Sequence, residues 1–194
     1  LLAGFWAPAS GVISLGGVDT KKIPFHQLAE EISFVSQDNF LFDVSIRDNI
    51  RLGKPDASED EIIRAAKAAH CHEFIMALPG GYETKAGVAG GAMSGGERQR
   101  ITLARAILKP ASTIILDEAT AYADPENEAL IQEAISHLVK GKNLVIVAHR
   151  LNTIKQAHQI ILIDKGQIIA KGRHDELLQE PLYASLWRQY LGEE

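Results

Sequence analysis

Met-Ser-Gly-Gly-Glu-Arg-Gln-Arg, residues 93–100, is the stretch of sequence that decides the fold of this chain. It runs into residues 101–108, whose apolar spacing predicts a helix. Ser94 is suited to cap that helix, and Gly95 and Gly96 let backbone N–H groups approach a ligand closely. Open N–H groups at the positive end of a helix dipole make an anion site. Read alone, the stretch also fits an ordinary capped helix that follows a glycine turn.

A second motif follows at residues 113–120, Thr-Ile-Ile-Leu-Asp-Glu-Ala-Thr. Its apolar and β-branched residues predict a strand that ends on two adjacent carboxylates, Asp117 and Glu118. In this order, the two motifs resemble the signature motif and the Walker B strand of ATP-binding-cassette (ABC) ATPases. The family's usual signature is LSGGQ, so Met93 stands in place of its leucine and Glu97 in place of its glutamine. Without the neighbouring motif, the two carboxylates would be read as a solvated strand end.

Length and composition are those of one soluble globular domain. The chain has 194 residues, of which 46% are hydrophobic and 23% charged, enough to form a sizeable core. The net charge is −5, which implies no general affinity for nucleic acid or for an anionic membrane. No apolar run reaches the length needed to cross a bilayer. These properties give no indication of nucleic acid as a partner.

The resemblance covers the whole chain and implies an α/β fold, a P-loop NTPase-like core sheet with an inserted α-helical subdomain. It predicts core elements in residues 1–38, the helical subdomain with the signature motif in 39–109, and further core elements in 110–194. The phosphate-binding loop GxxxxGK[ST], called Walker A, does not occur in the sequence. We therefore expect an N-terminally truncated ABC domain in which residues 1–6 form the last turns of a helix. Because that loop cradles the β- and γ-phosphates, the chain is expected to be inactive alone.

Local patterns predict further elements. Ser58 and Glu61 form a capping box at the start of a helix, and Pro125 is suited to the first turn of another. Residues 144–148 form a near-continuous apolar strand, as expected for a parallel sheet buried on both faces. Asp164-Lys165-Gly166 between two apolar runs indicates a hairpin, and residues 183–190 a terminal helix.

The chemistry that the resemblance implies is phosphoryl transfer from ATP to water, with Mg²⁺ as cofactor. Asp117 would hold Mg²⁺ directly or through water, and Glu118 would orient or polarise the attacking water as general base. Gln37, at the end of the predicted strand 32–38, matches the family's glutamine that contacts Mg²⁺ and the attacking water. His149 follows an apolar strand in the context Ala-His-Arg and matches the family's histidine that contacts the γ-phosphate and senses its loss. A lone glutamine or histidine at a strand end would otherwise be structural.

Other site residues depend on a second subunit. The ATPase domains of the family form a head-to-tail dimer, in which each ATP lies between one Walker A loop and the other subunit's signature. The signature residues expected to hold the partner's nucleotide are Ser94, Gly95, Gly96 and Glu97. Asp124 matches the aspartate of the family's D-loop, usually SALD, whereas the two residues before it depart from that pattern.

Two segments are expected to contact a transmembrane domain. Residues 37–42 contain the cluster Phe40-Leu41-Phe42, similar to the FLF segment of exporter-type ABC transporters that receives a coupling helix. An apolar cluster of this kind marks a contact surface, although a local hydrophobic core is an equal alternative for any one of its residues. The second segment is the glycine-rich loop 84–91, where Val88 occupies the position of the family's glutamate.

The sequence therefore predicts the ATP-binding and ATP-hydrolysing domain of an exporter-type ABC transporter, at the cytoplasmic face of a membrane. Its partners would be a second ABC ATPase domain and a transmembrane domain. One alternative is a soluble ABC ATPase of DNA repair or translation, but the chain has neither the long coiled-coil insertion of the first nor the tandem cassette of the second. The other alternative is a truncated module without enzymatic activity.

Overall fold

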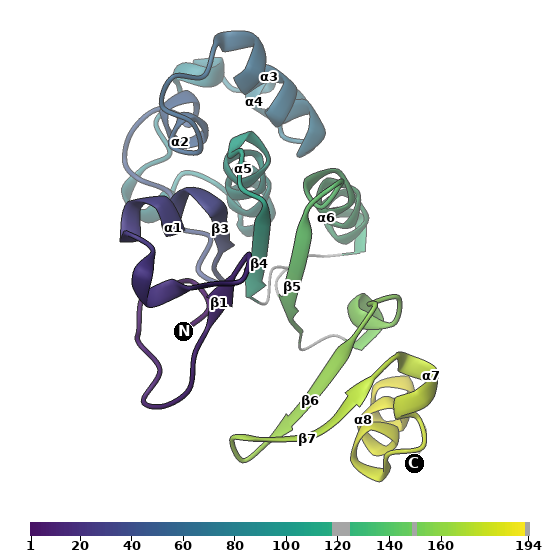
Figure 1. The fold of residues 1–194 in the computed structure, drawn as a ribbon. Helices are drawn as coiled ribbons and strands as arrows, with labels where there is room; N and C mark the ends of the chain where they lie inside the picture. The colour runs from purple at the N-terminus through teal and green to yellow at the C-terminus, as the bar shows by residue number, and fades with distance from the viewer. Residues whose placement is uncertain (118–124, 149–150, 193–194) are drawn as a thin grey trace. The chain divides into compact units, whose positions relative to one another are not determined.

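The structure is a computed structural model that describes residues 1–117, 125–148 and 151–192. The chain divides into two compact units, Leu1–Val147 and Ala148–Glu194. Figure 1 shows the elements of both units, which are described in turn.

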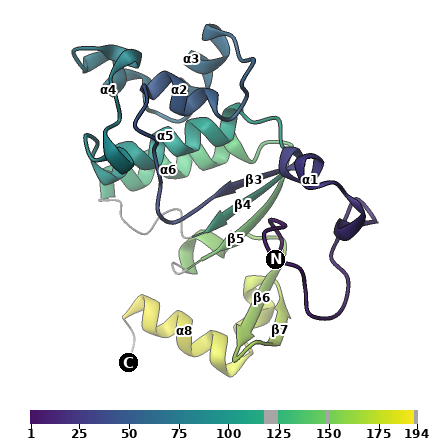
Figure 2. The same cartoon turned by 90° about the vertical axis from the view of Figure 1, so that its left-hand side faces the viewer.

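A parallel sheet of three strands forms the centre of the first unit. Its order is β3 (Ile32–Val35), β4 (Thr113–Asp117) and β5 (Asn143–Val147). Val35 lies opposite Leu116, and Asp117 lies opposite Val147, so the carboxyl ends of the three strands meet at one edge. Helices α5 (Gly95–Leu108) and α6 (Pro125–Leu138) run across one face of this sheet (Figure 2).

The middle strand connects the two cores of this unit. Ile114 and Leu116 belong to the main core beneath α5 and α6, whereas Ile115 points to the opposite face and packs with Leu28 and Ile32. This alternation follows from the two-residue period of a strand. The strand predicted from the apolar run in this position is present, and its apolar residues are buried on both faces.

Three helices form a small group beside α5, in which the first two pack on α5 and the third packs on the second. They are α2 (Ile46–Arg51), α3 (Glu59–Ala68) and α4 (His72–Ala77), and they lie between β3 and α5 in the chain. Gly53, just after α2, permits close packing there, because a Cβ atom at that position would collide with the carbonyl oxygen of Arg105. The predicted α/β fold with an inserted helical part is confirmed.

Cys71, the chain's one cysteine, is fully buried in the main core at the start of α4. Its thiol donates to the carbonyl oxygen of Ala66 at 3.3 Å. Burial raises the pKa of this thiol to about 12, because the thiolate would lose its hydration.

The remaining part of the first unit precedes β3. It contains β1 (Ser14–Leu15) and β2 (Val18–Asp19), an antiparallel pair, and α1 (Phe25–Glu31).

The prediction of a helix in residues 1–6 was wrong. This segment forms a turn in which Gly4 has φ +80° and donates its N–H to the carbonyl of Leu1. Within the described residues there are also short 3₁₀ turns at Thr20–Lys22, Gly81–Glu83, Val88–Gly90 and Leu151–Ile154.

The second unit is an antiparallel hairpin followed by two helices. Strands β6 (Ile160–Asp164) and β7 (Gln167–Gly172) are joined by Lys165 and Gly166, both with positive φ, as the predicted hairpin turn requires. Helix α7 (His174–Leu177) precedes α8 (Pro181–Leu191), which confirms the terminal helix. The hydroxyl of Tyr183 lies 3.0 Å from Nδ1 of His174 inside this unit.

The burial expected for the strand at 144–148 was wrong. Strand β5 alternates between exposed and half-buried residues, and Val147 is 49% exposed. It pairs with β4 on one side and stands at the end of the described sheet, so its apolar sequence is not fully covered. No helix in the described ranges is long and apolar enough to span a membrane.

Candidate functional site

The start of α5 is an exposed helix N-terminus with a capping box. Ser94 Oγ accepts from the backbone N–H of Glu97 at 3.3 Å, and Glu97 Oε2 accepts from the N–H of Ser94 at 2.7 Å. The first turn of a helix has no intrahelical acceptors, so the N–H groups of Gly95 and Gly96 remain available to an anion. The side chain of Glu97 is thus engaged with its own helix.

Gly95 has no role in packing that explains its identity. A Cβ atom at this position would meet no atom within 4 Å, and its backbone φ is not positive. The packing of this chain therefore does not require a glycine at position 95.

The side chain of Met93 points into the protein. It is 6% exposed and belongs to the main core, where it replaces the leucine of the usual signature. Methionine and leucine have similar volumes, so this substitution keeps the packing that precedes the helix. The variation at this position therefore leaves the start of α5 unchanged.

Two predicted site residues lie at one edge of the sheet. Asp117 is the last residue of β4, and Gln37 follows the end of the neighbouring strand β3 by two residues. Both side chains are half-buried. Because parallel strands present their carboxyl ends to the same edge, the fold brings a carboxylate and an amide oxygen to the edge where ligands of such sheets bind.

Three of the predicted site residues, Glu118, Asp124 and His149, lie outside the described residues. The structure therefore places six of the nine: Gln37, Ser94, Gly95, Gly96, Glu97 and Asp117.

The segment after Gln37 is held against α5 by buried polar side chains. Asn49 is fully buried in α2, and its amide both accepts from the N–H of Phe42 (2.9 Å) and donates to the carbonyl of Phe42 (3.0 Å). Arg105 of α5 donates to Asn49 through Nε and Nη2 and to the carbonyl of Phe40 through Nη1. Burial lowers the pKa of this guanidinium. These contacts leave the rings of Phe40 and Phe42 about half-exposed, in an edge-to-face pair 5.0 Å apart.

Sequence reasoning missed Asn49 and Arg105. The available signal was an asparagine three residues after Ile46 and next to Ile50, the two apolar residues of a short helix, since asparagine is unfavourable inside a helix unless its amide is bonded. Its partner lies 56 residues away, so the pattern near Asn49 does not identify it.

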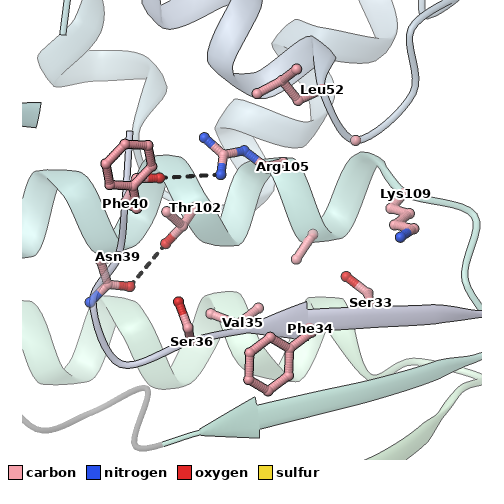
Figure 3. Close-up of a pocket in the computed structure, with 12 residues that line it drawn as sticks. Ser33, Phe34, Val35, Ser36, Asn39, Phe40, Leu52, Thr102, Arg105 and Lys109 are labelled. Atoms are coloured by element: carbon pink, nitrogen blue, oxygen red, sulfur yellow. Dashed lines mark hydrogen bonds between the residues drawn. The ribbon is translucent and has the colours of Figure 1, made fainter. Parts of the chain in front are cut away.

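A cavity of about 190 Å³ lies between β3 and α5 (Figure 3). Phe34, Val35, Phe40 and Leu52 supply apolar lining, and Arg105 and Lys109 supply the charged groups. Among the described residues that line it there is no carboxylate. Lys109 Nζ donates to the carbonyl of Ile32 at 2.9 Å, and burial lowers its pKa.

The residues just after the first segment expected to meet a transmembrane domain (37–42) pair with the start of the second (84–91). The N–H of Ile46 donates to the carbonyl of Thr84 (2.9 Å), and the N–H of Ala86 donates to the carbonyl of Val44 (3.0 Å). Beyond this pairing the second segment turns through Gly87, and Val88 is left 81% exposed. The surface that carries Phe40 and Phe42 and the loop that carries Val88 are therefore parts of one backbone-bonded region.

The sequence pattern of the family described as "ABC transporter" matches residues 1–121, which is more than half of the chain. The chain belongs to the ABC transporter family. The match includes the β3–α5 part of the fold and the start of α5 described above.

Individual ABC proteins match almost all of the chain. The "ATP-dependent lipid A-core flippase" of Legionella pneumophila (strain Paris) is 46% identical over 189 residues, which is 97% of this chain and 32% of the flippase. The "Putative multidrug export ATP-binding/permease protein YgaD" of Bacillus subtilis (strain 168) is 47% identical over 178 residues, 92% of this chain and 31% of that protein. The chain thus spans about a third of the length of these relatives.

A solved structure supports the same assignment of the fold. The "Structure of a bacterial Atm1-family ABC exporter with ATP bound" superposes with a TM-score of 0.91 at 35% identity, covering 97% of this chain and 33% of that one. The fold is that of the nucleotide-binding domain of an ABC exporter.

Proposed function

We propose that this chain is the ATP-binding and ATP-hydrolysing part of an exporter-type ABC transporter, which couples ATP-driven dimerisation to the movement of a substrate across a membrane. The observation that carries the proposal is the start of α5, where a capped helix presents two glycines whose N–H groups are free to bind an anion. The names of the relatives, a flippase and a putative multidrug export protein, support export as the direction.

Two sets of residues act on two different nucleotides in this proposal. Ser94, Gly95 and Gly96 bind the γ-phosphate of an ATP held mainly by a second ABC ATPase domain. Asp117 and Gln37, at the carboxyl edge of the sheet, serve the ATP of their own subunit. Each chain therefore contributes half of two sites, and ATP binding favours the dimer because it bridges the two halves.

The donors at the sheet edge fit Mg²⁺. A carboxylate from Asp117 and an amide oxygen from Gln37 are hard oxygen ligands, and Mg²⁺ at phosphate sites takes one or two carboxylates together with phosphate oxygens and water. When bound, the ion neutralises charge that develops on the phosphates. We assign the orientation of the attacking water to Gln37 and Glu118, with Glu118 as general base and His149 as the contact to the γ-phosphate. Asp124 would act in communication between the subunits.

The transmembrane domain would contact the region that carries Phe40, Phe42 and Val88. Exposed aromatic and aliphatic side chains on a rigidly held backbone are suited to an interface with another domain. The bonds from Asn49 and Arg105 connect this surface to α5, whose other end is the proposed nucleotide contact. Movement at the nucleotide would therefore be transmitted to the membrane-facing surface through one helix.

Replacement of Glu118 by glutamine in the complete transporter that carries this chain tests the proposal. We expect MgATP turnover to fall by at least about 100-fold, since a general base contributes that much or more, while ATP binding is retained. Turnover is measured by phosphate release and binding by equilibrium titration with MgATP. Glu73→Gln, at an exposed glutamate of α4, is the matched control and should keep wild-type turnover. A wild-type transporter without MgATP turnover, or a Glu118→Gln variant with full turnover, would contradict the assignment.

A further inference from the structure

Asn39 lies two residues after Gln37 and is buried, with 8% of its surface exposed. Its backbone has φ +46°, in the left-handed region that asparagine adopts more readily than most residues. Its Nδ2 donates to the backbone carbonyl of Gln37 at 3.2 Å, and its Oδ1 accepts from the hydroxyl of Thr102 at 3.0 Å. Figure 3 shows the second of these hydrogen bonds crossing from the loop to α5.

Thr102 lies on the buried face of α5, eight residues after Ser94, and is 7% exposed. Its hydroxyl oxygen also lies 2.8 Å from the carbonyl oxygen of Gln99, so one proton is shared between two acceptors. Residues on both sides of it in α5 are buried in the main core, which fixes the position of the hydroxyl. The loop residue Asn39 is thus bonded to a rigid part of the helix.

Asn39 and the neighbouring contacts have different roles. Arg105 holds the carbonyl of Phe40, and Asn49 holds Phe42, so both fix the backbone that follows Asn39. The amide of Asn39 instead reaches back to Gln37. It is therefore the described side chain that connects the backbone of Gln37 to α5, through Thr102.

We propose that Asn39 and Thr102 are positioning residues of the nucleotide site: the hydrogen bond between them ties the backbone of Gln37 to α5. This inference rests on the proposed function, because it acts through Gln37. Through this contact Gln37, which serves the chain's own ATP, keeps a fixed position relative to the first turn of α5, which binds the partner's ATP. Loss of the contact should therefore lower the rate of hydrolysis, kcat, and leave the affinity for ATP unchanged.

Thr102→Val in the complete transporter removes the hydroxyl and keeps the volume of the side chain. We expect kcat for MgATP to fall about tenfold, the equivalent of one buried hydrogen bond, with KM within about twofold of wild type. Asn39→Asp keeps the size and the tolerance of positive φ but removes the donor to Gln37, so it should lower kcat at least as much. Thr102→Val breaks the hydrogen bond from Thr102 to Asn39, and Asn39→Asp breaks the one from Asn39 to Gln37. Because either change interrupts the same chain of two bonds, the double variant should be far less impaired than the product of the two single effects.

Two further variants separate positioning from packing. Thr102→Ser restores the hydroxyl without the methyl group and should recover kcat to within about twofold of wild type. Ser136→Ala, which removes a helix hydroxyl bonded to the carbonyl of Glu133 on α6, is the remote control and should leave kcat unchanged. A Thr102→Val variant with wild-type kcat, or a Thr102→Ser variant as slow as Thr102→Val, would overturn the inference.

Amide hydrogen exchange provides a readout that does not depend on turnover. Thr102→Val should speed exchange in residues 36–39 while exchange in α5 stays as in wild type, because only the loop loses its anchor. If the wild-type transporter had no MgATP turnover, the proposed function would fail, and faster exchange at residues 36–39 would still support the contact. Unchanged exchange in Thr102→Val would overturn it.

Discussion

Helices α3 and α5 begin with the same capping arrangement, but the residues inside and around the two capping boxes differ. At each start a serine and the glutamate three residues later form a capping box, with nearly the same distances: 2.8 and 3.3 Å at Ser58 and Glu61, and 2.7 and 3.3 Å at Ser94 and Glu97. In α3 the two residues between them are Glu59 and Asp60.

The charged side chains around the two helix starts differ as well. At α3, Glu59 pairs with Arg47 (3.1 Å) and Arg51 (2.6 Å), and Glu61 also accepts from Lys54 Nζ at 2.6 Å. Three acidic residues in the first turn satisfy the positive end of that helix within the chain itself. In α5 the corresponding positions are glycines, and we propose that the same end binds an external anion. A capping box thus specifies a helix start, and the residues inside the box decide whether that start can bind a ligand.

The largest effect is expected from Gly95→Asp, which gives α5 the kind of first turn that α3 has. An acidic residue near a helix N-terminus is favourable by about 0.3–1 kcal/mol, and the space around this Cβ is open, so stability should not fall. A carboxylate beside the phosphate site should nevertheless reduce MgATP turnover at least about 100-fold. Thermal unfolding and phosphate release measure the two changes. Asp60→Gly on α3, at the position that matches Gly96, makes the opposite kind of change, and it should lower stability and leave turnover intact. Loss of turnover in both variants would remove the functional distinction between the helices.

The paired variants Ser58→Ala and Ser94→Ala test the cap itself. Each removes an acceptor for the N–H of the following glutamate and should cost about 1 kcal/mol in unfolding free energy. Only Ser94→Ala should also lower MgATP turnover, by about tenfold, because Ser94 is proposed to contact the γ-phosphate. Denaturant unfolding and steady-state turnover of the two variants, measured side by side, are the relevant experiments. Equal turnover in both would mean that Ser94 acts as a cap alone.

The smallest expected effect is a change in thermal stability at acidic pH. The hydrogen bond from Lys54 and those from Ser58 lower the pKa of Glu61 from 4.5 to about 2. A carboxyl whose pKa is depressed in the folded state stabilises it above the unfolded pKa, and this contribution is lost as the pH falls from about 4.5 towards 2. Glu61→Gln should therefore reduce the melting temperature at pH 6 more than at pH 3. The matched variant is Glu97→Gln, which restores the family's usual residue in the other capping box. A pH-independent difference for Glu61→Gln would contradict the assignment of the pKa shift.

The sequence predicted the elements whose local pattern is strong. The start of α5 at Ser94, the strand ending at Asp117 and the turn at Lys165 and Gly166 were correctly placed, because caps, apolar runs and positive-φ turns are set by neighbouring residues. The helix expected in residues 1–6 was wrong because Gly4 takes φ +80° there.

Long-range contacts could not be predicted in the same way. The bonds of Arg105 to Asn49 and of Thr102 to Asn39 join residues 56 and 63 positions apart, and nothing in the pattern around one partner specifies the other. The half-exposed state of β5 depends on its place in the sheet and not on its own apolar residues. For the site, the sequence identified the residues at the start of α5 and at the sheet edge, and their chemical roles stay predictions.

The burial of Cys71 has a practical consequence for experiments on this region. A thiol with a pKa of about 12 and no exposed surface is almost entirely unreactive towards alkylating labels at neutral pH. Because it is the only cysteine of the chain, the chain is ready for site-directed spectroscopy without replacement of a native residue. A cysteine introduced at Val88 would be its single fast-reacting thiol, so a spin label or fluorophore there would report on the loop 84–91 alone.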